Sequence, residues 1–248
     1  MKKIIKRSLW GVGILLLVIT LVIVSFSIKI KAELKKMNPV ETKEIVKNIY
    51  AVNDTFVNMY LVKDSDHYVA IDAGNNIESI KNQLHKLNID PTKIIAVLLT
   101  HSDHDHVAAI PLFKNANVYL ASAEEQMING KTARVMGTYN KLPVKNYTLI
   151  SDHQFLNLGG IKIENILTPG HTPGSMSYLI NDKYLFVGDA FGLENGKIIK
   201  PNPMFTNDMP TAIRSFQKIK NLSHVTYIFT GHTGYTNNYR NAVNTNLK

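Results

Sequence analysis

Four short stretches of this chain end an apolar run on histidine or aspartate, and they constrain the fold more than any other feature. The run Ile94–Leu99 opens almost directly into His-Ser-Asp-His-Asp-His at 101–106. Later apolar runs end at His171, which lies between two Pro-Gly pairs, at Asp189 and at His232. Short apolar runs bounded by Gly and Pro are typical of buried strands. Because strand ends are rigid, they hold polar side chains at fixed distances, and we predict that these four meet at one site.

Each stretch taken alone has an ordinary explanation. A single histidine after a strand is most often a hydrogen-bonded loop residue, and an aspartate after glycine is most often a turn former. The repetition of the pattern at four strand ends favours a metal centre instead. The chain contains no cysteine, so its ligands would be histidine and carboxylate.

The four motifs together resemble a known family. The segments THSDHDH, GHTPGS, GDA and TGH resemble the successive metal motifs of the metallo-β-lactamase superfamily, over roughly residues 45–235. The resemblance implies an α+β fold, a four-layer αβ/βα sandwich with two metal ions at one edge. It implies a first metal held by His101, Asp103 and His171, and a second held by Asp105, His106 and His232, with Asp189 bridging the two.

The first motif departs from the usual His-x-His-x-Asp-His at one position, where this chain has Asp103. We interpret Asp103 as a carboxylate ligand and the adjacent His104 as a residue of the rim or of the solvent-exposed surface. Three carboxylates and a bridging hydroxide would neutralise two divalent cations, whereas histidine at position 103 would leave one positive charge. Zinc is our first choice because most of the ligands are imidazoles, while oxygen ligation makes iron or manganese possible.

The resemblance implies a metal-dependent hydrolase in which a hydroxide bridging the metals cleaves an ester, lactone or thioester bond of a small molecule. Asp105 would be the catalytic residue that orients the hydroxide and accepts its proton. No lysine closely follows Asp189 to hold a β-lactam carboxylate, so β-lactamase activity is disfavoured. Gly192 stands where typical acyl-homoserine lactonases carry tyrosine, so the resemblance does not assign the substrate. A diiron redox enzyme and a non-catalytic, membrane-tethered binding domain remain as alternatives, which the metal content of the protein would distinguish.

A second feature is the uncharged segment Ser8–Ile28, which is long enough for a transmembrane helix. No small-residue cleavage site follows it, so we favour an uncleaved, single-pass anchor in the cell membrane over a signal peptide. We predict a basic head at 1–7, the membrane helix at 8–28, a polar linker at 29–43 and a catalytic domain at 44–248. The short head and the absence of cysteine favour a catalytic domain outside the cytoplasm.

The net charge of +9 is concentrated around that segment. Residues 1–40 carry eight basic side chains and one acidic one, and the rest of the chain is close to neutral. A nucleic-acid partner is therefore not expected. No protein partner is evident, and the predicted partners are a small-molecule substrate and the lipid bilayer that surrounds residues 8–28.

The remaining pattern predicts strands followed by alternating strands and helices, which favours two mixed sheets packed face to face. We expect strands at 45–52, 56–64 and 67–74, hairpins around Gly159-Gly160 and Asn181-Asp182, and a final strand at 225–232. We expect helices at 77–89 and 209–222. Residues 123–147, with Arg134, Tyr139 and Lys141, match no periodic pattern; a solvated excursion is the first interpretation and a lid over the site the second.

Overall fold

The computed structural model describes residues 2–247, and for residues 2–9 and 12 it describes the backbone alone. Met1, in the predicted head, and Lys248, in the predicted catalytic domain, lie outside the described residues. The chain divides into two compact units, Met1–Met37 and Asn38–Lys248.

The first unit contains a single helix, α1 (Lys2–Leu34). By length and composition, its part Gly13–Leu34 could cross a membrane. The helix continues through residues 29–34, where we expected a polar linker. No glycine or proline interrupts the chain between Gly13 and Pro39, and the intervening residues are compatible with a helix.

The second unit contains two large sheets, and the first has seven strands in sequence order. The predicted strand 45–52 is divided into two strands by a turn in which Asn48 has a φ of 70°. Asparagine tolerates this left-handed conformation, so the chain turns here without a glycine or proline to mark the break in the apolar pattern. The strands are β1 (Lys43–Val46), β2 (Ile49–Asp54), β3 (Val57–Asp64), β4 (His67–Ile71), β5 (Ile94–Leu98), β6 (Asn117–Ala121) and β7 (Thr148–Ile150).

The second sheet has the strand order β15-β14-β11-β10-β9-β8, and both predicted hairpins lie in it. The pair β8–β9 turns at Gly159-Gly160 and the pair β10–β11 turns at Asn181-Asp182, as expected. The final strand was predicted at 225–232, and the structure has a shorter strand there, β14. The strands are β8 (Phe155–Leu158), β9 (Ile161–Leu167), β10 (Met176–Ile180), β11 (Tyr184–Phe186), β14 (Tyr227–Phe229) and β15 (Tyr235–Thr236), with a separate hairpin of β12 (Gly192–Glu194) and β13 (Lys197–Ile199).

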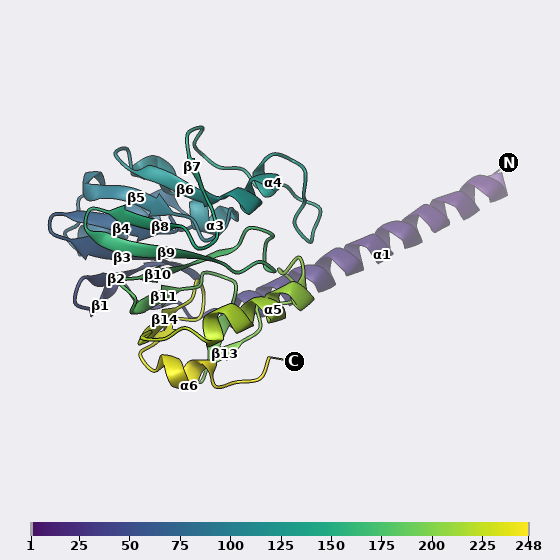
Figure 1. Ribbon diagram of the computed structural model, residues 1–248. Helices are drawn as coiled ribbons and strands as arrows, with labels where there is room; N and C mark the ends of the chain where they lie inside the picture. Colours follow the sequence, from purple (N-terminus) through teal and green to yellow (C-terminus); the bar gives the residue numbers. More distant parts are fainter. Residues whose placement is uncertain (1, 248) are drawn as a thin grey trace. The chain divides into compact units, whose positions relative to one another are not determined.

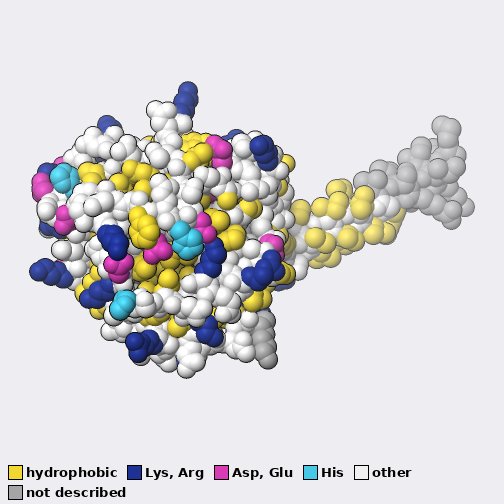
Figure 2. Space-filling view, in the orientation of Figure 1, with side chains coloured by type: hydrophobic (Ala, Val, Ile, Leu, Met, Phe, Trp, Pro, Cys, Tyr) yellow, Lys and Arg dark blue, Asp and Glu magenta, His cyan; other side chains and the backbone are white. Residues whose placement is uncertain are grey.

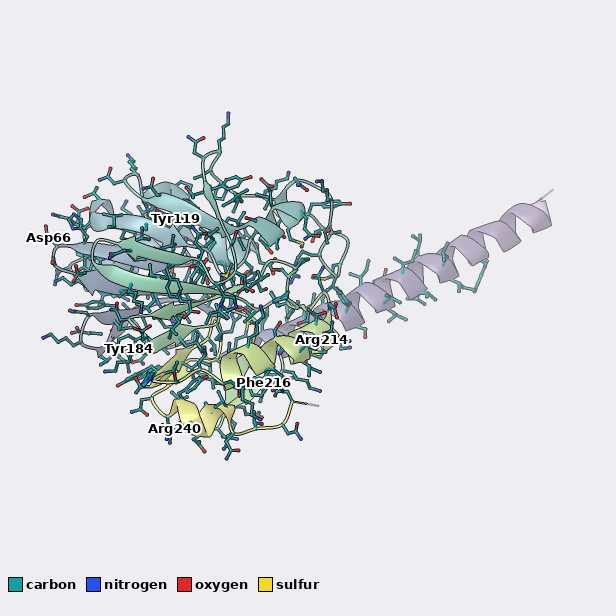
Figure 3. The ribbon with its side chains drawn as sticks, in the orientation of Figure 1. Asp66, Tyr119, Tyr184, Arg214, Phe216 and Arg240 are labelled. Atoms are coloured by element: carbon teal, nitrogen blue, oxygen red, sulfur yellow. The ribbon has the colours of Figure 1, made fainter. Side chains whose placement is uncertain are left out.

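The two sheets pack face to face around one apolar cluster. Tyr60, Ile71 and Leu98 of the first sheet share it with Tyr178 and Phe229 of the second. Figure 3 shows Tyr119 on β6 and Tyr184 on β11, both at the margin of this cluster. Burying one face of each sheet against the other forms the two inner layers of the domain.

Helices cover the outer faces of both sheets. Ile80 and Leu84 of α2 (Ile77–Lys86) pack in a cluster with the first sheet. Phe216 and Ile219 of α5 (Met209–Lys220) pack in another with the second sheet, and α6 (Tyr239–Val243) joins them. Figure 1 shows α5 and α6 on the side of the second sheet. The predicted four-layer sandwich is confirmed.

The remaining helices are short. They are α3 (His104–Val107), α4 (Glu125–Ile128) and the 3₁₀ turns Pro91–Lys93, Ile110–Leu112 and Ser122–Glu124. Because β5 runs parallel to β4 and β11 runs parallel to β14, the carboxyl ends of each pair lie at the same edge of their sheet. Most of the predicted site residues follow the ends of β5, β11 and β14, and His171 follows β9.

Candidate metal centre

The structure brings all seven predicted ligands together at one edge of the sandwich. Their side chains form three groups, and within each group the nitrogen and oxygen atoms lie within 4.8 Å of one another. The segments that carry them follow β5, β9, β11 and β14, in the order that the sequence pattern indicated. The groups are His101 with Asp103 and His171, His101 with His106 and Asp189, and Asp105 with His106 and His232.

The first group is centred on the Asp103 carboxylate. Its Oδ2 atom lies 3.5 Å from His101 Nε2 and 3.3 Å from His171 Nε2. Asp103 is the residue just before α3, and its backbone is extended. Its side chain therefore does not follow the helical spacing of Asp105 and His106. His104 begins α3 and is exposed, in agreement with its interpretation as a rim or surface residue.

The second group lies beside Asp189. His232 Nε2 is 2.9 Å from Asp189 Oδ2 and 3.4 Å from Asp105 Oδ2, while His106 Nε2 is 3.5 Å from Asp189 Oδ1. Asp189 also lies 3.7 Å from His171 Nε2 of the first group. The aspartate is therefore positioned between the two groups, where a bridging ligand would be required.

Three buried atoms of this cluster have no hydrogen-bond partner: His101 Nε2, His106 Nε2 and Asp189 Oδ1. An unpaired buried donor or acceptor costs free energy, so native proteins rarely keep several of them in one place. Imidazole nitrogens and carboxylate oxygens are the atoms that bind divalent transition metals. The arrangement of the donor atoms fits a metal centre.

The sequence model of the metallo-beta-lactamase superfamily matches residues 52–232, which include every residue of this cluster. The chain belongs to this superfamily. The match covers most of the second compact unit and none of α1.

Two of the sequence relatives are hydrolases by name. A probable polyketide biosynthesis zinc-dependent hydrolase of Bacillus velezensis is 35% identical over 155 residues, which are 61% of this chain and 60% of the relative. A hydroxyacylglutathione hydrolase of Aliivibrio fischeri is 31% identical over 196 residues, 75% of this chain and 65% of the relative. The chain thus spans less than two thirds of either relative.

Solved structures of the superfamily share the fold. A metallo-beta-lactamase family protein of Thermus thermophilus superposes with a TM-score of 0.63 at 20% identity, covering 81% of this chain and 78% of that one. The subclass B3 metallo-beta-lactamase BJP-1 of Bradyrhizobium japonicum gives 0.63 at 20% identity, with 80% of each chain covered.

Asp72 is a residue of the site that our sequence reasoning missed. It follows β4, and its Oδ2 lies 2.8 Å from His106 Nδ1, on the side of the ring opposite Nε2, the nitrogen that faces Asp105 and Asp189. Thr100 holds Asp72 in place by donating its backbone N–H, at 2.7 Å, and its hydroxyl. In metal sites generally, such a partner fixes the tautomer and orientation of the histidine ligand. A signal was available, because Ile71-Asp72 ends an apolar run as Asp189 does.

Glu124 was also missed, and no sequence pattern distinguishes it. This buried carboxylate accepts hydrogen bonds from the Ser102 hydroxyl at 2.6 Å and the Thr172 hydroxyl at 2.6 Å. Both partners adjoin predicted ligands, His101 and His171. Glu124 therefore joins the first and second metal motifs, which are far apart in the sequence.

Residues 123–147 lie against the site and are more than a solvated excursion. Arg134 Nη2 is 2.9 Å from Asp103 Oδ2 and 3.2 Å from His171 Nε2. Asn140 Nδ2 donates to Asp103 Oδ1 at 2.7 Å. Both oxygens of the Asp103 carboxylate thus bind this segment. On the face of the domain shown in Figure 2, histidine, acidic and basic side chains lie close together.

The pKa values of the cluster shift in opposite directions. Burial lowers the pKa of His106 and of His232, but neighbouring carboxylates, Asp189 first, outweigh it and raise both pKa values above their ordinary range. Burial raises the pKa of Asp189, but His232 and His106 more than offset this effect and hold that pKa well below its usual range. Burial also raises the pKa of Asp103, and His101 and His171 reverse the shift. The pKa of His171 falls below its ordinary value because the ring is buried. Ionised carboxylates and a neutral imidazole are the forms that bind cations.

Proposed function

We propose that this protein is a binuclear metal-dependent hydrolase that cleaves an ester, lactone or thioester bond of a small molecule. The observation that carries the proposal is the convergence of His101 Nε2, His106 Nε2 and Asp189 Oδ1, buried and without hydrogen-bond partners, at one sheet edge. A purely structural cluster would satisfy these atoms within the protein.

The proposed ligands divide as the distances do. His101, Asp103 and His171 would hold one divalent cation, Asp105, His106 and His232 the other, and Asp189 would contact both. When bound, such cations polarise a carbonyl oxygen and generate a hydroxide nucleophile near neutral pH. Zinc is favoured by the histidine-rich donor set and by the zinc-dependent relative from Bacillus velezensis.

Asp105 would orient the nucleophile and accept its proton. Its Oδ2 lies 3.4 Å from His232 Nε2 and 3.7 Å from His106 Nε2, and its side chain is partly exposed on the site. His232 cannot rotate freely, because its Nδ1 lies 2.7 Å from the carbonyl oxygen of Phe56, and Phe56 stacks on the imidazole. These contacts fix the orientation of the His232 ring, which lies beside the proposed proton acceptor Asp105.

The proposal is tested by metal analysis of the full chain and a panel of ester, thioester, lactone and β-lactam substrates. Two zinc ions per chain and turnover of an ester, lactone or thioester support it. Two iron ions with a visible charge-transfer band support the diiron redox alternative, and a protein that retains no metal supports the non-catalytic one.

We also propose that α1 anchors the chain in the cell membrane through residues 8–28, with the hydrolase domain outside the cytoplasm. The chain has no cysteine, so a cysteine introduced at Phe155, which is 59% exposed, provides a unique label site. In intact cells a membrane-impermeant maleimide should label this variant. Labelling only after permeabilisation would place the domain on the other side.

A further inference from the structure

Residues 135–139 form an exposed turn beside the candidate metal centre, which we name the site tip. The N–H of Arg134 donates to the carbonyl oxygen of Thr138 at 2.7 Å. The N–H of Gly137 donates to the carbonyl oxygen of Arg134 at 2.8 Å. Gly137 has a φ of 75°, a conformation that favours glycine. The turn is a defined structure with a closed base.

The base of the site tip is fastened to the centre itself. Arg134 and Asn140, on either side of the tip, bind the two oxygens of Asp103. Asn207 Nδ2 also donates to the carbonyl oxygen of Ala133, at 3.0 Å. The tip is therefore held at the centre while its own side chains point outward.

The outward side chains are apolar. Val135, Met136 and Tyr139 are 51%, 50% and 55% exposed. In the part of the chain from Asn38 to Leu247, the other exposed large apolar side chains occur singly along the sequence, at Ile77, Leu149, Phe155 and Ile199. Single exposed apolar residues are ordinary on a protein surface, but three within five residues, beside a proposed active site, indicate an interaction surface.

Basic side chains flank this apolar turn. Lys131, Lys141 and Lys145 are exposed, and no acidic residue occurs between Gln126 and Ser151. Apolar and aromatic side chains bordered by lysine are suited to the interface of a bilayer that contains anionic lipids. The aliphatic part of each lysine can lie along the apolar layer while its ammonium group remains among the headgroups.

The second compact unit is bonded to the site from its first residue. The N–H of Asn38 donates to the carbonyl oxygen of His232, a proposed metal ligand, at 2.7 Å.

We propose that the site tip inserts Val135, Met136 and Tyr139 into the interfacial layer of an anionic bilayer, with Lys131, Lys141 and Lys145 on its headgroups. The inference rests on the proposed membrane anchoring and on no step of the proposed hydrolysis. It places the mouth of the metal centre at the bilayer surface, where amphiphilic esters and thioesters are concentrated.

The test uses the full chain with a single introduced cysteine, Met136→Cys, carrying an environment-sensitive NBD fluorophore. The labelled protein is reconstituted into vesicles of phosphatidylcholine with phosphatidylglycerol. We expect the emission to shift to shorter wavelength and to be quenched by brominated lipids. The matched control is Phe155→Cys on β8, because Phe155 is 59% exposed and Met136 is 50% exposed. The control should show neither effect.

The outcomes are distinguishable. Emission from Met136→Cys that matches the Phe155→Cys control in anionic vesicles would overturn the proposal. The combined substitutions Lys131→Glu, Lys141→Glu and Lys145→Glu should abolish the shift, and a shift that survives them would overturn the role of the lysines. Chains that fail to float with vesicles would refute the anchoring by α1. The readout needs neither metal nor substrate, so an inactive protein would refute the proposed hydrolase without affecting this result.

Discussion

The guanidinium of Arg134 lies 2.9 Å from the Asp103 carboxylate and 3.2 Å from His171 Nε2. Asp103 replaces the histidine that is usual at this position in the superfamily, and it adds a negative charge to the cluster. Arg134 restores one positive charge at the same place. It is mostly buried, so the interaction is weakly screened by solvent. The arginine also occupies space next to two atoms that we propose as metal ligands.

Arg134→Gln should therefore increase the affinity of the first group for a divalent cation. The substitution removes a positive charge that opposes the cation and frees the Nε2 atom of His171. We expect a change of about tenfold, or about 1.4 kcal/mol, from the loss of one partly buried charge. Competition with a chromophoric chelator measures it. Arg214→Gln, on α5 (Figure 3), is the control. Weaker cation binding by Arg134→Gln would show that Arg134 mainly positions Asp103.

Asp103→Ala should lower the metal content as much as His101→Ala does, because we propose that both side chains bind the same ion. His104→Ala should have a much smaller effect, since His104 is exposed. Elemental analysis of the purified variants measures all three. The double variant Asp103→Ala/Arg134→Gln avoids leaving the arginine without a partner, and it should lose metal as well. Two tightly held metal ions in Asp103→Ala would contradict the assignment.

Asp72→Asn should weaken cation binding by about 10- to 100-fold, the usual effect of removing the carboxylate partner of a histidine ligand. Asp72 lies 2.8 Å from His106 Nδ1 and contacts no proposed cation, so it acts as a positioning residue. Isothermal titration of the metal-free protein with zinc measures the change. Asp66→Asn removes an exposed carboxylate elsewhere in the domain and should leave the affinity unchanged. Equal affinities for both variants would exclude the positioning role.

Asp152 should contribute fully to stability above its unfolded-state pKa and should lose that contribution as the pH falls through its folded-state pKa. Burial raises the pKa of this carboxyl, but the hydrogen bonds from Lys218, at 2.7 Å, and from the Leu167 N–H lower it below its ordinary value. A carboxyl with a depressed pKa in the folded protein stabilises the fold at high pH, and the contribution is lost as the pH falls below about 4.

Urea unfolding of the full chain in detergent, followed by near-ultraviolet circular dichroism, tests this prediction. The destabilisation caused by Asp152→Asn should be full above about pH 5 and should vanish as the pH falls through the folded-state pKa. Asp182→Asn, which removes an exposed partner of Lys162, should change stability little at any pH. A difference that grows on acidification would reverse the sign that we derive.

Serine at all three apolar positions of the site tip should change the preference of the hydrolase for substrate chain length. If the tip lies in the bilayer interface, replacing Val135, Met136 and Tyr139 removes apolar contact with that layer. We expect the ratio of kcat/KM for p-nitrophenyl dodecanoate to that for p-nitrophenyl butyrate, both measured in anionic vesicles, to fall at least about tenfold. An unchanged ratio would indicate that the tip does not help deliver amphiphilic substrates.

The apolar pattern predicted two mixed sheets packed face to face, and the resemblance to the superfamily implied the four-layer sandwich and the residues that converge in it. Burial requires apolar strands, and the turn that ends each strand is determined locally by Gly, Pro, Asp or Asn. The tips at His101, His171, Asp189 and His232 were therefore visible as a linear pattern. The resemblance to the superfamily supplied the expected pairing of these tips, which the apolar pattern does not contain.

Tertiary structure decided which other side chains reach the site. Asp72 follows the neighbouring parallel strand β4, Glu124 lies in a short 3₁₀ turn, and Arg134 lies in a segment without periodicity. Their contacts with His106, Ser102 and Asp103 join residues 22 to 34 positions apart in the sequence. Local sequence carries no record of such contacts, because they depend on how the packed layers bring separate loops to one edge.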